Sequence, residues 1–244
     1  MKKFLLVFSL IMVGSLANAT GILNVDFSSA DEITLVTDLN ATNFWKKKGL
    51  SQEKVLSVGQ KIMVDNKINK RVPIVVPTKK TNVAYSNIYD KTVTIYEGML
   101  YYIDNDDELA FVLAHEIAHS VEAYGGFVKY ISMRANSKKY EQKADITAID
   151  YMVKAGYNPI AAISMGNKIF GEPLFDWGFT YTHPKGSKRL IAMYKHIYTK
   201  YPQYLNSAYT KNASYKNFEY AMGKEIGSFQ QKQRNRQLKQ KDEL

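Results

Sequence analysis

The chain has 244 residues, of which 45% are hydrophobic and 23% are charged, a size and composition that suit one compact domain with a substantial core. It contains no cysteine, which excludes thiol catalysis, disulfide bridges and a lipid anchor on cysteine. The formal net charge of +10 favours acidic partners, such as anionic lipid headgroups or acidic unfolded chains, or else reflects a solubilising lysine-rich surface. No nucleic-acid recognition motif accompanies this charge, so we expect no nucleic-acid partner.

The first 19 residues are typical of a secretory signal peptide. Lys2 and Lys3 precede an apolar run over 4–17, and the small residues of Ala17-Asn18-Ala19 provide a cleavage site. The run is too short to cross a bilayer, and no later stretch approaches the roughly 18 apolar residues that a membrane-spanning helix needs. We therefore expect a periplasmic or secreted bacterial protein that is soluble once residues 1–19 are removed. The final Lys-Asp-Glu-Leu leaves the lumen of the endoplasmic reticulum as the alternative.

Apolar periodicity and turn residues predict mainly helices in the rest of the chain, and there is no internal repeat. The predicted fold class is α+β, with a small β-sheet beside the central helix that starts at Asn105 and ends at Gly125-Gly126. We divide the chain into the signal peptide (1–19), one domain over 20–205 and a basic polar tail or frayed helix over 206–244. Further helices are expected over 51–66, over 159–170 and over 187–200, and another that contains Glu141 and Asp145 should end at Gly156. The strands are expected over 72–76, 82–85 and 93–96.

The central helix carries the most informative motif, His115-Glu116-Ile117-Ala118-His119. Residues four apart lie on one face of a helix, so His115 and His119 can bind the same zinc ion. Glu116 then lies beside the open coordination position, where a general base is needed. The alternative is a pair of surface histidines with an incidental glutamate.

A catalytic zinc usually has three protein ligands, and the third is expected on the next helix. Glu141 and Asp145 are also four residues apart, so Glu141 can bind the metal while Asp145 accepts a hydrogen bond from the second nitrogen of a ligand histidine. A solvated acidic helix face is the alternative for this pair. Glu122 is a rival ligand, but it shares the helix of His119 and would strain to reach the same ion. We predict one Zn²⁺ per chain, held by His115, His119 and Glu141.

Three further residues complete the predicted site or lie outside it. His183 precedes Pro184 and is expected either to donate a hydrogen bond to the oxyanion of the transition state or to act as a reversible fourth ligand; the alternative is a buried turn histidine. Arg189 either holds the His183 loop through a carboxylate or faces solvent. His196 is expected on a helix surface without a role.

The His-Glu-x-x-His motif followed by Glu141-x-x-Ala144-Asp145 resembles the gluzincin metallopeptidases of the CAAX-prenyl-protease/HtpX family, in particular their soluble periplasmic branch. The resemblance extends over about 51–198. It includes the strand pair at 82–85 and 93–96 and the closing motifs at 155–159 and 182–184 with Arg189. Val83 and Lys185-Gly186 depart from the family pattern at peripheral positions. The resemblance implies a zincin-type domain over 20–205 with zinc metalloendopeptidase activity.

We therefore expect an exported endopeptidase that cleaves unfolded or misassembled envelope proteins, with Glu116 assisting the attack of zinc-bound water. The strand at 82–85 would pair with extended substrates through main-chain hydrogen bonds that give little sequence preference. The alternative is a chaperone-like assembly factor for envelope proteins with latent peptidase activity. Expected partners are unfolded or extended polypeptides, with envelope assembly machinery or an anionic membrane surface as further candidates. A closed structural zinc site would have four ligands and no need of Glu116.

Overall fold

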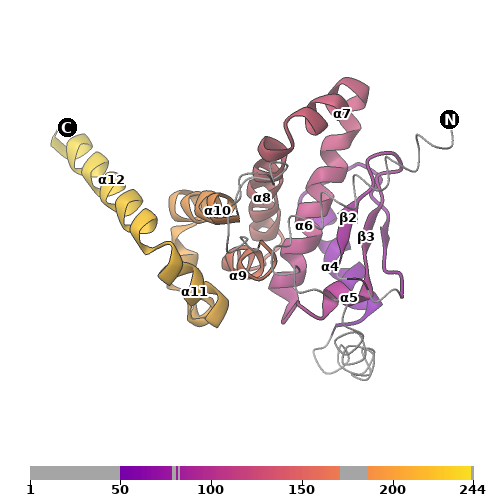
Figure 1. The fold of residues 1–244 in the computed structure, drawn as a ribbon, viewed down its shortest axis with the longest axis horizontal. Helices are drawn as coiled ribbons and strands as arrows, with labels where there is room; N and C mark the ends of the chain where they lie inside the picture. Colours follow the sequence, from indigo (N-terminus) through magenta and orange to yellow (C-terminus); the bar gives the residue numbers. More distant parts are fainter. Residues whose placement is uncertain (1–49, 79–80, 82, 171–185, 243–244) are drawn as a thin grey trace, which may run out of the picture.

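The computed structural model of the protein describes residues 50–78, 81, 83–170 and 186–242, and shows a helical body with a small sheet on one side (Figure 1). The predicted α+β class is confirmed. The expected signal peptide and His183 lie outside the described residues. Within them, no helix is both long and apolar enough to cross a membrane. The elements are α4 (Gln52–Asp65), β1 (Ile74–Val75), β2 (Ala84–Ser86), β3 (Val93–Ile95), α5 (Glu97–Leu100), α6 (Asp106–Glu122), η1 (Ala123–Gly125), α7 (Gly126–Ala135), α8 (Ser137–Lys154), α9 (Ile160–Ile169), α10 (Gly186–Lys200), η2 (Pro202–Asn206), η3 (Ala208–Lys211), α11 (Ala213–Ala221) and α12 (Gly223–Asp242).

Helix α6 lies at the centre of the body and contacts α4, α8, α9 and the sheet (Figure 1). It begins at Asn105, whose Oδ1 accepts the backbone N–H of Glu108 at 3.0 Å. The carboxylate of Glu108 accepts the N–H of Asp104 at 2.8 Å, which makes the predicted capping box a variant shifted by one residue. The helix gives way to η1, and the chain turns at Gly126, where φ is +82°. Both ends of the helix are therefore where the sequence predicts them.

The sheet is small and has the order β1-β3-β2, with β1 parallel and β2 antiparallel to β3. The expected strand over 72–76 is reduced to two residues, because Pro73 and Pro77 on either side lack an N–H for the ladder. Strand β2 is an edge strand. The backbone N–H and C=O groups alternate in direction along β2. Those of Tyr85 face β3, whereas those of Ala84 and Ser86 point away from it.

Helix α8 ends as its sequence predicts. Gly156 adopts φ +78°, and the N–H of Tyr157 bonds to the carbonyl of Met152 at 2.9 Å, which is the 6→1 bond of a Schellman turn. The turn leads into α9, whose residues from Ile160 to Gly166 are all buried. The predicted helices over 159–170 and 187–200 correspond to α9 and α10.

Most of the predicted polar tail is helical in the structure. Helix α11 contacts α9 and buries Tyr215 and Phe218 in the core. Only α12 leads away from the body, toward the C-terminus (Figure 1). The aromatic residues at 215 and 218 are three apart and therefore share one face of the helix, which explains why this part of a polar segment is packed.

A buried ion pair fixes the first turn of α6 to α9. Nζ of Lys168 lies 2.8 and 2.7 Å from the two carboxylate oxygens of Glu108, which is 0% exposed, and 3.3 Å from the carbonyl of Tyr102. The sequence analysis did not predict this pair, since its members are 60 residues apart. Glu108 is fully buried and Lys168 is 17% exposed, so removal of the lysine leaves the Glu108 carboxylate without its cation.

Replacement of this lysine should therefore destabilise the fold. We expect Lys168→Met to lower the free energy of unfolding by about 3 kcal/mol, measured by urea denaturation, because Glu108 loses its cation. The matched control is Lys61→Met, which removes an exposed i,i+4 pair with Asp65 and should cost no more than about 0.5 kcal/mol. Equal effects of the two substitutions would contradict a special role for the buried pair.

Candidate metal centre

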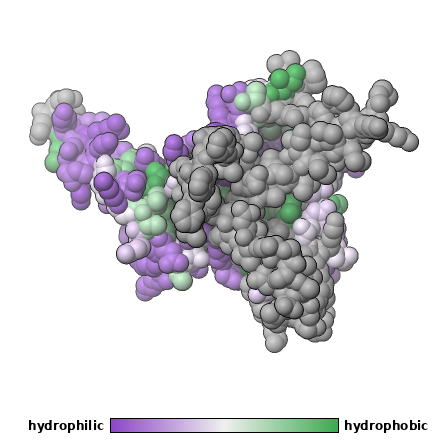
Figure 2. Space-filling model, viewed as in Figure 1, coloured by the Kyte–Doolittle hydropathy of each residue, from purple (hydrophilic) through white to green (hydrophobic). Residues whose placement is uncertain are grey.

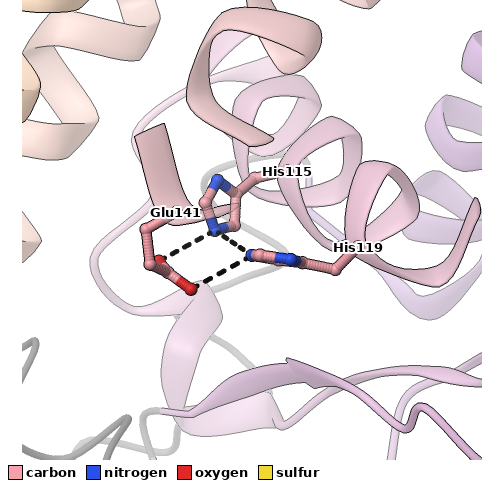
Figure 3. Close-up of side chains that lie close together, drawn as sticks. All are labelled: His115, His119 and Glu141. Carbon is pink, nitrogen blue, oxygen red and sulfur yellow. Dashed lines mark hydrogen bonds and ion pairs between the residues drawn. The ribbon is translucent and has the colours of Figure 1, made fainter. Parts of the chain in front are cut away.

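Three side chains from two helices converge at the predicted metal site (Figure 3). His115 and His119 project from the same face of α6, and Glu141 reaches toward them from α8. The two Nε2 atoms are 3.2 Å apart, Nε2 of His119 is 3.2 Å from Oε1 of Glu141, and Nε2 of His115 is 3.6 Å from Oε2 of Glu141. The donor atoms all lie within 4.8 Å of one another, as a shared metal ion requires.

The geometry of these atoms fits zinc. Tetrahedral zinc with ligand bonds of about 2.0–2.2 Å places its ligand atoms about 3.3–3.5 Å apart. The observed separations of 3.2, 3.2 and 3.6 Å lie close to this range. Two imidazole nitrogens and one carboxylate form a donor set of the catalytic kind, which leaves a coordination position for water or substrate.

Asp145 and Arg189 contact the predicted metal ligands: Asp145 lies beside His115, and Arg189 lies beside Glu141. Oδ1 of Asp145 lies 3.0 Å from Nδ1 of His115, within ion-pair distance of the ring when it is protonated. The guanidinium of Arg189 donates to both oxygens of Asp145, each at 2.7 Å, and Nη1 lies 3.2 Å from Oε2 of Glu141. Arg189 is only 3% exposed, and its guanidinium stacks 3.8 Å from the ring centroid of Phe170.

These neighbours favour positive charge at the site. Burial would raise the pKa of Glu141, but His119 and Arg189 hold that pKa well below its usual range. Burial also acts to raise the pKa of Asp145, and Arg189 outweighs it. Burial would lower the pKa of His115, yet the carboxylates of Asp145 and Glu141 raise it to about 10. Two ionised carboxylates beside both rings thus favour a cation at this point, as expected of a metal centre.

Glu116 lies between the metal ligands and the sheet. It follows His115 on α6, is buried, and its carboxylate accepts the backbone N–H of Ser86 at the outer edge of β2. Burial raises the pKa of Glu116, with the two ligand histidines opposing the rise. A carboxyl group with a raised pKa can take up and release a proton nearer neutral pH than an exposed carboxyl group can.

The structure separates Glu122 from the site. Its carboxylate pairs with Lys143 at 2.5 Å and with Lys129, and it is not part of the group of possible ligands among the described residues. These two lysines hold the pKa of Glu122 below its usual value, although burial acts to raise it. The rival to Glu141 is thus engaged elsewhere.

The remaining predicted residues fare differently. His183 lies outside the described residues, so its role stays a prediction. Arg189 does not face solvent, which was one of its two alternatives, and instead binds Asp145 and Glu141. His196 is partly buried, with Nε2 2.7 Å from Oδ1 of Asp150 on α8, rather than free on the surface.

The sequence contained a signal for the burial of Arg189 that the analysis did not use. Position 189 lies four residues before Met193 and eight before Ile197, in the apolar stripe of α10. An arginine in such a stripe is buried with the rest and must find carboxylate partners there. Asp145 and Glu141 were the acidic residues already assigned to the site.

Fold and site together define a class: the protein is a zinc metallopeptidase, a hydrolase of peptide bonds, with two histidines of α6 and a glutamate of α8 in a group that could hold the metal ion. Residues 49–125 match the model of Peptidase family M48. The matched segment contains His115, Glu116 and His119 and ends before Glu141. Searches of the curated proteins and of the solved structures returned no significant match.

The assignment of the third ligand can be tested by metal content. We expect Glu141→Ala to lose zinc during purification, because two histidines alone leave the ion weakly bound. Asp145→Asn, which keeps the shape, should weaken zinc binding about 10- to 100-fold in chelator competition. The control is Glu122→Ala on α6, one turn after His119, and this variant should keep about one zinc per chain. Loss of zinc from the Glu122 variant, with retention by the Glu141 variant, would reverse the assignment.

The buried arginine can be tested through stability. Arg189→Met should lower the free energy of unfolding by about 3–5 kcal/mol, because it leaves the buried carboxylate of Asp145 and the half-buried carboxylate of Glu141 without their cation. In a double-mutant cycle, Asp145→Asn should cost less in the Arg189→Met background than in the wild type, with a coupling of at least about 1 kcal/mol. Additive losses in urea denaturation would show that the two side chains do not stabilise each other.

Proposed function

We propose that this metallopeptidase is an exported endopeptidase that cleaves unfolded or misassembled envelope proteins. The observation that carries the proposal is the position of Glu116, which lies beside the metal ligands and accepts the N–H of Ser86 on an edge strand. A base, a metal group and a strand edge are thus adjacent. Extended polypeptide is the kind of substrate that such a strand can hold.

The edge of β2 supports main-chain recognition. The alternation of the antiparallel ladder directs the N–H and C=O of Ala84, and the C=O of Ser86, away from β3. An extended peptide can pair with these groups as an added strand, and its side chains then contribute little to affinity. Folded proteins seldom offer such a segment, whereas unfolded or misassembled chains do. This selectivity for conformation suits a role in quality control.

The residues of the site divide the chemistry among them. Zinc held by His115, His119 and Glu141 would supply a Lewis acid that polarises the scissile carbonyl and lowers the pKa of water. Glu116 would accept the proton of the attacking water and pass it to the leaving amine. The N–H of Ser86 keeps the Glu116 carboxylate in place, and Asp145 supports the ring of His115.

The cellular setting of the proposal comes from the amino-terminal segment. Residues 1–19 have the charge and apolar pattern of a secretory signal, so envelope proteins are the unfolded chains the enzyme would meet. Removal of residues 1–19 takes Lys2 and Lys3 from the formal net charge of +10 and leaves +8, which favours acidic polypeptides among them.

A single substitution tests the proposed chemistry. Glu116→Gln should keep about one zinc per chain but lower the cleavage of an unfolded reporter protein at least about 100-fold, because the amide preserves shape without accepting a proton. The control is Glu122→Gln, which makes the same substitution six residues further along α6. Its activity should be near that of the wild type. Full activity of the Glu116 variant would contradict the mechanism.

The same variant identifies the substrates. Exported, inactive Glu116→Gln protein should retain bound chains, which mass spectrometry after affinity purification can name. Unfolded envelope proteins are the expected result. If the Glu116 variant also restores growth to a strain that lacks the gene, then an assembly role rather than peptide cleavage is the function.

A further inference from the structure

Phe170 is an aromatic residue that packs on the guanidinium of Arg189. It follows α9 directly and is 8% exposed, and Cζ of Arg189 lies 3.8 Å from the centroid of its ring. At this distance the planar cation stacks on the face of the ring, which is most favourable when both groups are removed from water. Arg189 is 3% exposed, so the stack is buried. The ring therefore contacts the cation that holds the acidic side of the metal centre.

The hydrogen bonds of Arg189 leave one motion of its guanidinium open. Nε and Nη2 each donate to Asp145 at 2.7 Å, which fixes the line along which the two groups meet. The guanidinium plane can still tilt about that line, because a carboxylate oxygen accepts hydrogen bonds over a broad range of directions. A tilt would carry Nη1, which lies 3.2 Å from Oε2 of Glu141, away from that carboxylate. The contact with the metal ligand therefore needs a group that sets the tilt.

The ring of Phe170 is placed to set this tilt. A flat aromatic face at van der Waals distance prevents the guanidinium from turning toward it, and the attraction between cation and ring opposes a turn away. The ion pair of Nη1 with Glu141 is longer than either bond to Asp145 and has no second bond beside it, so it depends most on the tilt. The ring can thus act on a metal ligand although it is not itself in the group of possible ligands.

Two glycines make room for Phe170. Gly166 is buried in α9, and a Cβ at that position would lie 2.9 Å from Cε2 of the ring and 3.0 Å from Cδ2 of Leu190. Gly186 begins α10, and a Cβ there would clash with the carbonyl oxygen of Phe170. Glycine inside a helix costs stability, so its presence at a buried helix position indicates a close approach that a larger residue would prevent. The position of the ring is therefore fixed by α9 and α10 as well as by Arg189.

From this arrangement we propose that Phe170 is a positioning residue of the metal centre, which sets the tilt of the Arg189 guanidinium and thereby strengthens zinc binding by Glu141. The contacts lead from the ring to Arg189, and from Arg189 to the carboxylates of Asp145 and Glu141. Support of this kind keeps a ligand near the geometry that the ion needs. Loss of the aromatic face should weaken zinc binding even though every ligand is still present.

Zinc affinity of the full chain, measured by chelator competition, tests the proposal without any substrate. Phe170→Leu keeps an apolar side chain but removes the aromatic face. It should weaken zinc binding about tenfold, the lower end of the range for groups that hold a metal ligand in place. The matched control is Phe218→Leu on α11, at a ring that is 0% exposed and lies against tyrosines rather than an arginine. The control should also destabilise the fold but change zinc affinity less than about twofold. Equal losses of zinc affinity in the two variants would overturn the proposal.

A double-mutant cycle separates the tilt from general packing. Arg189→Lys keeps a cation but has no plane to stack, so adding Phe170→Leu in that background should weaken zinc binding by less than about a further twofold. The same loss in both backgrounds would show that the ring acts by packing alone, and the proposal would fall. Zinc affinity of Phe170→Leu equal to that of the wild type would have the same consequence.

A second variant moves the ring without removing it. In Gly166→Ala the new methyl group must shift the ring edge, whereas alanine itself favours the helix, so circular dichroism should show an intact fold. Zinc affinity should fall about threefold, less than for loss of the aromatic face. The matched control is Gly227→Ala on α12, which Figure 2 shows as hydrophilic along most of its length and where an added Cβ meets nothing within 4 Å. Unchanged zinc affinity in the Gly166 variant, or the same loss in the Gly227 variant, would contradict the role of the ring.

Discussion

The guanidinium of Arg189 contacts the buried carboxylate of Asp145 and the half-buried carboxylate of Glu141, and this interaction connects three helices. It links α10 to Asp145 and Glu141 on α8, and these carboxylates in turn contact the histidines of α6. A buried carboxylate is costly unless a cation accompanies it, so Arg189 offsets much of the cost of holding the acidic side of the metal centre inside the domain. The fork of the guanidinium also fixes the orientation of Asp145 through two parallel bonds.

The site therefore combines opposing local demands. The ligands must lie together before the metal binds, although their charges are costly to bury. Arg189 offsets the two carboxylates of α8, while Glu116 is partly compensated by a backbone N–H from the sheet. Rigid surroundings maintain this arrangement, because the first turn of α6 is capped by Asn105 and fixed to α9 by the pair of Glu108 and Lys168.

Sequence reasoning was sufficient where a signal is local. Spacing within one helix predicted that His115 and His119 share a face, and glycines at 126 and 156 marked the ends of two elements. The approach of Glu141 was predicted from the chemistry that two histidines leave incomplete. Local signals could not supply the contacts of Arg189 with residues more than 40 positions away, or the pair of Glu108 and Lys168, because these depend on how helices pack. The same limitation explains why Tyr215 and Phe218 seemed to belong to a polar tail.

The alternation of β2 would constrain a peptide that paired with this strand in the way proposed above. A chain added to the outer edge of β2 would bond to the strand through every second residue of each partner, and Ser86 already gives its N–H to Glu116. A shift by one residue would turn each of its side chains to the opposite face, so a chain bound in this way would keep the same face toward the site only if it moved by two residues, about 6.8 Å. Bonds of one parity along the chain would then pass before Glu116 in the same orientation, and successive cuts within one bound segment would release fragments with an even number of residues.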